Sequence, residues 1–242
     1  MGKLFYNLGK KLGPKLRRAK WLWQSIAGTE ADAIRLEHEV GRDLAREIKS
    51  QLHLDPQPQA AQMLNQIGPK LASRVADKRR TFRFDIVKGH EPNAFALPGG
   101  FIFITRSLLE LCEQNPDELA FIIAHEMAHV IRGHAMDRFI SNSAIALGSR
   151  AAPIRGLIAR WLRTVGVKFL ESAYSQDLEF EADTLGARLT AAAGYDPKAP
   201  AKLLSRLAKL PRPANHTGLG SYFSSHPPFD LRIERVNRLL KP

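Results

Sequence analysis

The order of polar and apolar positions divides the first part of the chain into two expected helices. The first has Thr29 or its neighbour as N-cap, carries the acidic residues Glu30 and Asp32 in its first turn, and runs to about residue 50. The sequence Pro56-Gln57-Pro58 then predicts a loop. A second helix is expected over about residues 59–78.

The pattern changes after residue 80. Phe82, Phe84 and Ile86 alternate with Arg83, Asp85 and Val87, a period of two that predicts a half-buried strand.

Two further strands are expected at residues 93–97 and 101–104, on either side of Pro98-Gly99-Gly100. Helical patterns dominate from about residue 105, and no internal repeat is visible. We therefore expect an α+β fold that is mostly helical and contains a small sheet.

The N-terminal residues form a distinct segment. Leucines recur there every four residues among lysines, and an aromatic stretch follows at residues 21–23. This pattern is typical of a basic amphipathic helix. Either residues 1–23 bind an anionic membrane surface, or they form a solvated tail whose tryptophans dock on the protein. We divide the chain into this segment, residues 1–28, and a folded domain, residues 29–242.

Composition and charge limit the possible classes of function. The 242 residues are 44% hydrophobic and 25% charged, which is typical of a folded protein. The net charge of +12 is concentrated in residues 1–20, which carry seven basic and no acidic side chains. The rest of the chain lacks basic residues interleaved with aromatic ones, so we expect no specific nucleic-acid partner. The sequence does not indicate the oligomeric state.

A single cysteine, Cys112, excludes an internal disulfide and a zinc site made of several thiolates. Cys112 lies in an apolar run, where a small buried hydrophobe is expected rather than a nucleophile.

The sequence contains no recognisable membrane span or secretion signal. The most apolar stretch, residues 119–131, is short and contains polar residues. We expect a cytoplasmic or peripheral membrane protein. The basic, acid-poor N-terminal segment leaves organelle targeting open.

Residues 125–129 match the H-E-x-x-H pattern. On a helix, His125 and His129 lie one turn apart on the same face and can bind one metal ion. Glu126 is then placed to act as general base on a water activated by zinc. The structural alternative is a pair of histidines that form hydrogen bonds inside a core helix.

A catalytic zinc needs a third protein ligand. Ala135 occupies the position where some zincins place a third histidine, and His134 is one residue away, so its role is more plausibly supportive or structural. Downstream, Glu179 and Asp183 share a helix face, whereas Glu181 points elsewhere. Glu179 can therefore bind the metal while Asp183 orients a ligand histidine. A solvated acidic helix is the alternative, but small Ala182 and Gly186 favour close packing of that face.

Residues 154–169 show an apolar helical face with arginines away from it. The arginines disfavour a membrane span. A lid over the cleft, a helix on a membrane surface and an ordinary core-facing helix remain open.

Four motifs together resemble one family. They occur in the order N-A-F-A-L-P-G-G at residues 93–100, H-E-M-A-H at 125–129, E-F-E-A-D at 179–183, and S-H-P-P at 225–228 with Arg232. In these motifs the chain resembles the zinc metallopeptidases of the CAAX prenyl endopeptidase, HtpX and Oma-type proteases, metallopeptidase family forty-eight. The resemblance covers roughly residues 30–240, although the spanning helices of the prenyl peptidase are lacking.

The resemblance implies a zincin-type, gluzincin-like domain with its sheet beside the H-E-x-x-H helix. It implies one Zn²⁺ ion per chain, bound by His125, His129 and Glu179, with Glu126 as general base and Asp183 supporting a ligand.

The resemblance also implies a substrate strand. An extended polypeptide would pair with the strand that contains Asn93, Ala94, Phe95 and Ala96. A short strand that ends in Pro-Gly-Gly also suits an exposed sheet edge.

His226 has two possible roles under this resemblance. It donates a hydrogen bond to the oxyanion, or it occupies the open zinc position and holds the enzyme inactive, as in some relatives. A turn histidine before Pro227 is the structural alternative. Arg232 is expected to anchor this segment to a carboxylate.

These expectations describe a zinc metalloendopeptidase, a hydrolase of peptide bonds, in protein quality control at or near a membrane. The alternative is a non-catalytic, zinc-stabilised scaffold or chaperone-like membrane factor. The presence of Glu126 disfavours that alternative.

Overall fold

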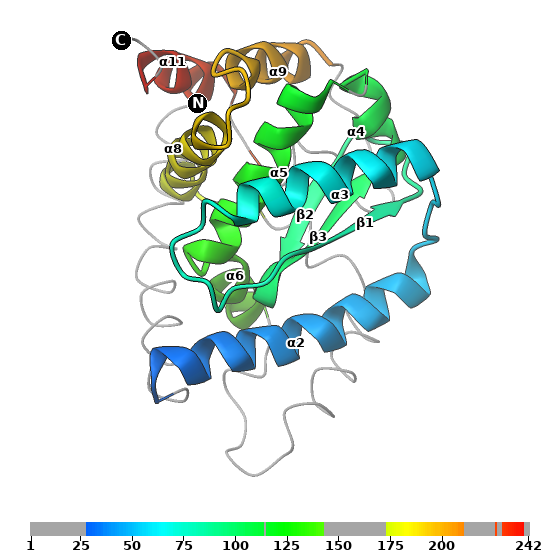
Figure 1. The fold of residues 1–242 in the computed structure, drawn as a ribbon, viewed down its shortest axis with the longest axis vertical. Helices are drawn as coiled ribbons and strands as arrows, with labels where there is room; N and C mark the ends of the chain where they lie inside the picture. The colour runs from blue at the N-terminus through cyan, green and yellow to red at the C-terminus, as the bar shows by residue number, and fades with distance from the viewer. Residues whose placement is uncertain (1–27, 114, 143–172, 211–225, 227–228, 240–242) are drawn as a thin grey trace.

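The computed structural model describes residues 28–113, 115–142, 173–210, 226 and 229–239. The described helices and strands, in chain order, are α2 (Glu30–Gln51), α3 (Pro58–Ala72), β1 (Arg83–Val87), β2 (Ala94–Leu97), the short 3-10 helix η1 (Pro98–Gly100), β3 (Phe101–Thr105), α4 (Arg106–Leu111), α5 (Pro116–Ile131), α6 (His134–Asn142), α8 (Gln176–Ala192), α9 (Ala199–Ala208) and α11 (Phe229–Leu239). Figure 1 shows this arrangement.

The sheet has three strands in the order β1-β3-β2. β3 pairs in parallel with β1 and antiparallel with β2, in a register that places Phe95 opposite Phe103. β2 and β3 are joined by η1, where Gly99 and Gly100 have φ of 71° and 89°, conformations that glycine adopts without steric cost. In the described sheet, β2 lies at one edge, because its only neighbour in the strand order is β3.

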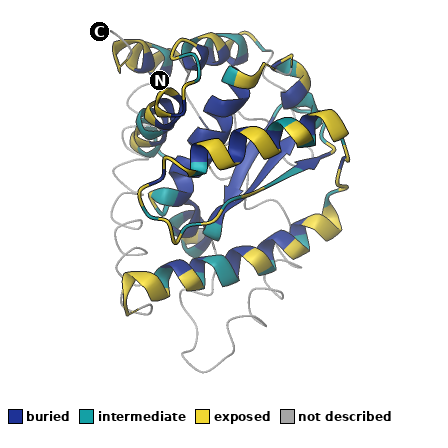
Figure 2. Cartoon of the chain, viewed as in Figure 1, coloured by how far each residue is buried: buried dark blue, intermediate teal, exposed yellow. Residues whose placement is uncertain are grey.

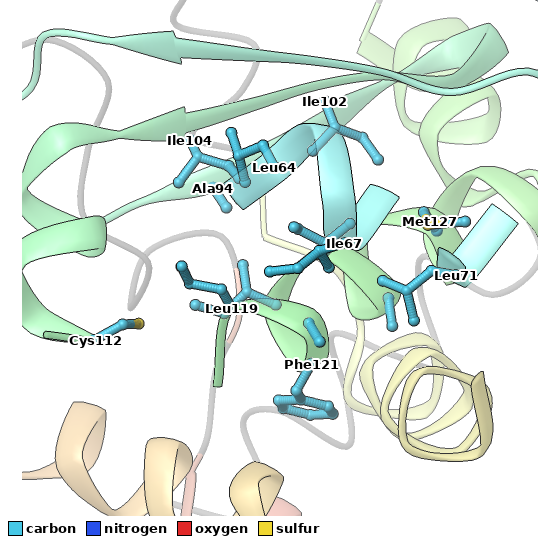
Figure 3. Close-up of a cluster of buried hydrophobic side chains, with 14 of the residues drawn as sticks. Leu64, Ile67, Leu71, Ala94, Ile102, Ile104, Cys112, Leu119, Phe121 and Met127 are labelled. Atoms are coloured by element: carbon cyan, nitrogen blue, oxygen red, sulfur yellow. The ribbon is translucent and has the colours of Figure 1, made fainter. Parts of the chain in front are cut away.

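Both faces of the sheet are covered, and β2 and most of β3 are apolar on both sides, whereas β1 also carries Arg83 and Asp85. Helices α3 and α5 cover one face, and α2 covers the other (Figure 1). Alternation along the strands sends Ile102 and Ile104 to the α3–α5 side, and Phe101 and Phe103 to the α2 side. The α3–α5 cluster, drawn in Figure 3, is the larger hydrophobic core.

Several expected helix starts are present. Thr29 caps α2 in a capping box with Asp32, since the side chain of each accepts a hydrogen bond from the backbone N–H of the other. Asn115 caps α5 by accepting from the N–H groups of Asp117 and Glu118, and Pro116 occupies the first turn. The expected strand pair around residues 98–100 is also observed.

Two local expectations need correction. The second helix ends at Ala72 rather than near residue 78, because the backbone turns there and the side chain of Ser73 donates to the carbonyl of Lys70. Val87 is fully buried although it was assigned to the polar face of its strand, because α2 covers that face. The H-E-x-x-H helix ends at Ile131, and Gly133, with φ of 77°, separates α5 from α6.

Helix α5 runs through the interior of the molecule. Its residues from Glu118 to Val130 are all buried, while α2 and α3 expose one side to solvent (Figure 2). Within the described part of the chain, no helix is both long and apolar enough to cross a bilayer. The expectations for residues 1–23 and 154–169 lie outside the described residues.

Candidate metal centre

The centre lies where α5 packs against α8. Gly186 of α8 makes a close approach possible, because a Cβ atom there would lie 3.0 Å from the backbone nitrogen of His125. Ala182, one turn earlier, is fully buried. This contact brings the acidic face of α8 onto the histidine face of α5, as the small residues indicated.

Four side chains converge on one buried point. His125, His129, Glu179 and His226 are fully buried, and one candidate ligand atom from each lies within 4.8 Å of all the others. The Nε2 atoms of His125 and His129 are 3.1 Å apart, and Oε1 of Glu179 lies 3.4 Å from Nε2 of His129. The structure thus brings together the three ligands expected from the sequence and adds His226 to them.

The chemistry of these donors fits zinc. Imidazole nitrogens and a carboxylate are common zinc ligands, and bonds of about 2.0–2.2 Å in a tetrahedron place neighbouring donors about 3.3 Å apart. The distances from Nε2 of His129 to Nε2 of His125 and to Oε1 of Glu179 are close to that value. Nε2 of His125 lies 3.7 Å from the other oxygen of Glu179, Oε2. His226 completes the set, with Nδ1 3.4 Å from Nε2 of His125 and 2.8 Å from Oε1 of Glu179. A tetrahedral ion with four protein ligands would fit these residues.

Glu126 lies beside this group without belonging to it. Its carboxylate is fully buried, and neither oxygen has a hydrogen-bond partner among the described residues. Oε1 lies 3.5 Å from Nε2 of His226. Burial raises the pKa of Glu126 to about 7, against the opposing influence of nearby cations. A carboxylate with this pKa can accept and release a proton near neutral pH.

Asp183 and Arg232 support the centre from α8 and α11. Oδ1 of Asp183 lies 3.0 Å from Nδ1 of His125, which leaves Nε2 of that ring for the metal. The guanidinium of Arg232 donates two hydrogen bonds to Asp183, at 2.7 and 2.8 Å. Burial alone would raise the pKa of Asp183, but the charge and hydrogen bonds of Arg232 outweigh it and hold that pKa below its usual value.

Arg232 also contacts two members of the ligand group, Glu179 and His226. It lies 3.1 Å from Oε2 of Glu179 and donates to the backbone carbonyl of His226 at 3.2 Å. The carboxylate contact expected for Arg232 is therefore present. The position of His226, fully buried inside the ligand group, is not that of an ordinary turn histidine.

Sequence reasoning missed two buried side chains next to the ligands. The ring of Tyr174 stacks on His129 at a centroid distance of 4.0 Å. The guanidinium of Arg138 in α6 lies over the Tyr174 ring, 4.5 Å from its centroid. Arg138 also donates to the carbonyl of Ala96 at 3.0 Å. No spacing rule marks these residues, because each reaches the centre from a separate segment.

Glu181 was expected to point away from the centre. It lies outside the ligand group, with 44% of its side chain exposed, and its Oε2 is 3.4 Å from Nε2 of His134. Nδ1 of His134 lies 3.1 Å from Nδ1 of His129. His134 is buried, and burial lowers its pKa to about 4, so the ring is neutral at pH 7.

The expected substrate strand is β2 together with Asn93. The N–H of Thr105 donates to the carbonyl of Asn93, so the alternation of an antiparallel pair turns the backbone groups of Ala94 and Ala96 away from β3. However, Asn93 and all residues of β2, including Phe95, are buried. The strand is at an edge, but the expectation of an exposed edge is wrong, since α5 and α6 pack beside it.

Comparison with known proteins identifies the family. A family model described as "Peptidase family M48" matches residues 58–240. The chain belongs to peptidase family M48. This result confirms the resemblance drawn from the four motifs, and the α+β zincin-type fold is confirmed by the three-stranded sheet beside α5.

Two M48 relatives illustrate the similarity. The mitochondrial metalloendopeptidase OMA1 of Saccharomyces cerevisiae is 32% identical over 161 residues, which cover 62% of this chain and 44% of the yeast protein. The beta-barrel assembly-enhancing protease of Escherichia coli O157:H7 is 29% identical over 203 residues, which cover 79% of this chain and 39% of that protein. The chain thus matches less than half the length of these relatives.

Proposed function

We propose that this M48 chain is a zinc-dependent endopeptidase. The observation that carries the proposal is the convergence of two imidazoles of α5 and one carboxylate of α8 next to a buried glutamate. Zinc in such a site would supply Lewis acidity and make water a better nucleophile at neutral pH.

The chain's own residues have distinct tasks in this reaction. Glu126 accepts a proton from the attacking water and returns it to the nitrogen of the leaving amine, for which its raised pKa is suitable. Asp183 holds His125 in the tautomer that presents Nε2 to the metal. Arg232 balances the charge of the two buried carboxylates, Glu179 and Asp183.

His226 gives this site a closed form. A catalytic zinc keeps one position open for water or substrate, whereas four protein ligands fill a tetrahedron. The placement of His226 among the ligands favours an inhibitory role over donation to the oxyanion. His226 must then withdraw before a peptide is cleaved.

A polypeptide substrate would bind along β2 as an added strand. The outward backbone groups of Ala94 and Ala96 support this placement, although Arg138 already donates to the carbonyl of Ala96. Entry of a substrate therefore requires displacement of the groups that now bury this edge.

The central experiment combines zinc analysis with casein cleavage. Wild type and Glu126→Gln should each hold one zinc per chain, and the variant should lose cleavage by a factor of at least about 10². The pair should also be made in a His226→Ala background, so that a closed site does not mask activity. Glu110→Gln, an exposed residue of α4, is the control and should cleave normally.

The proposal fails if wild type binds no zinc, or if Glu126→Gln cleaves as fast as its parent in both backgrounds. Zinc binding without cleavage by any parent protein would favour the non-catalytic scaffold.

The role of His226 is tested by the sign of one change. Replacement with alanine should raise the rate of casein cleavage, because it opens the fourth position. A fall in that rate with zinc retained would instead assign His226 to the oxyanion.

We also propose a role in protein quality control at or near a membrane. The names of the relatives, one mitochondrial and one enhancing beta-barrel assembly, support this proposal, as do the basic residues near the N-terminus. Deletion of residues 4–23 should abolish co-sedimentation with anionic vesicles. Unchanged co-sedimentation would exclude these residues as the anchor.

A further inference from the structure

His134, a buried histidine outside the ligand group, contacts His129 on the side of its ring away from the other ligands. Nδ1 of His129 and Nδ1 of His134 are 3.1 Å apart, which is a hydrogen-bond distance, and both side chains are buried. The two residues belong to different helices, because Gly133 breaks the chain between α5 and α6. The break turns His134 back towards His129.

The contact determines which nitrogen of each ring carries a proton. Nε2 of His129 faces His125 and Glu179, so this is the atom available to the metal. A neutral imidazole that binds metal through Nε2 carries its hydrogen on Nδ1. His129 therefore donates from Nδ1, and His134 must accept at Nδ1, which places the hydrogen of His134 on Nε2.

A carboxylate stands at the far end of this chain of contacts. Nε2 of His134 lies 3.4 Å from Oε2 of Glu181, and the other oxygen of Glu181 is 3.0 Å from Nε of Arg132. The side chain of Glu181 is 44% exposed and thus contacts solvent as well as Arg132 and His134. A carboxylate in this place favours the Nε2–H tautomer of His134 that the contact with His129 requires.

We infer that His134 is a positioning residue that, together with Glu181, orients His129 for metal binding. The inference rests on the proposed zinc site. His125 receives such support directly from Asp183, whereas His129 receives it through one intervening imidazole. Alternate residues of α8, at positions 179, 181 and 183, would thus supply a ligand and the supports of both histidines.

The test is the zinc affinity of the full-length protein, measured by competition with a chromogenic chelator. His134→Phe keeps a buried ring but removes the acceptor, and zinc should bind about 10- to 100-fold more weakly. His134→Asn restores an acceptor oxygen and should recover part of that loss. His38→Phe, a half-buried histidine of α2 remote from the ligands, should bind zinc as wild type does.

Substitution of Glu181 provides a test at an exposed position, where the fold is little affected. Glu181→Leu should weaken zinc binding about tenfold, at the lower end of the same range, whereas the exposed Asp177→Leu of the same helix should not. The absorption spectrum of the cobalt-substituted protein should change in His134→Phe and return towards wild type in His134→Asn.

Wild-type zinc affinity and an unchanged cobalt spectrum in His134→Phe would overturn the inference. An affinity of His134→Asn no better than that of His134→Phe would overturn the acceptor role. Failure of the zinc site itself is distinguishable, because wild type would then bind no zinc in the same competition assay.

Discussion

Helix α5 is buried on two sides that differ in chemistry. On one side, Leu119 and Met127 join an apolar cluster shared with α3 and the sheet (Figure 3). On the other side, His125 and Glu126 face the polar centre shared with α8. Both sides exclude water almost completely. Their burial is therefore alike, and only the bonding within each side differs.

This difference in bonding determines how much stability a substitution on each side of α5 removes. An apolar contact is non-directional, and loss of one methylene removes about 1 kcal/mol. A buried ion pair depends on every partner, because a charge that loses its partner keeps its full desolvation cost. One side of α5 thus stabilises the fold and tolerates small substitutions. The other side carries the metal-site residues and does not tolerate loss of a charged partner.

The largest expected effect comes from Arg232→Met, which leaves Asp183 and Glu179 buried without their shared cation. The free energy of unfolding of the metal-free protein should fall by about 3–5 kcal/mol. Ile123→Val, the matched change on the apolar side, should cost only about 0.5–1.5 kcal/mol. Urea unfolding followed by circular dichroism measures both values. Equal losses would contradict the contrast between the two sides.

An intermediate effect is expected at the seam between α5 and α8. A side chain at position 186 would press on the backbone of His125, so Gly186→Val should cost about 1–3 kcal/mol of stability. It should also weaken zinc binding, because α8 carries Glu179. Thermal unfolding and chelator competition measure the two effects. Arg188→Val, on the exposed side of α8, is the control, and an equal effect there would exclude a packing cause.

The smallest perturbation of the structure is expected from a probe at Cys112 on the apolar side, because it needs no substitution. Burial raises the pKa of its thiol to about 12, so at pH 8 the folded protein presents a neutral, inaccessible thiol. The unfolded chain ionises near pH 9 and reacts. Iodoacetamide should label the folded protein at least about 10³-fold more slowly than the protein in urea.

Labelling of Cys112 should be equally slow in His226→Ala. Opening of the metal centre would then leave the apolar side intact. Faster labelling of that variant would show that the two sides open together.

Local signals in the sequence predicted much of the fold and the ligands. The cap formed by Thr29 and Asp32 depends on residues three apart, and His125 and His129 are four apart, so spacing along one helix was sufficient. Glu179 and Asp183 were found in the same way, as one face of α8. The small residues Ala182 and Gly186 on that face indicated that it packs closely against another helix.

Contacts that depend on how separate segments pack were not predictable. Arg138 reaches Ala96 across 42 residues, and Tyr174 stacks on a histidine of another helix. Glu181 lies off the ligand face, as the spacing predicted, but its contact with His134 was not predictable, because His134 turns back after Gly133. The burial of β2 and of Val87 likewise depends on neighbouring helices.

The late position of Arg232 in the chain affects how the metal centre can form during translation. The ribosome produces α5 and α8 well before α11, and 49 residues separate Asp183 from the guanidinium that neutralises it. Until those residues have emerged, the nascent α8 must either keep its carboxylates in water or dock with uncompensated charge. The nascent protein can therefore complete the metal centre only after nearly all of the described fold has been translated.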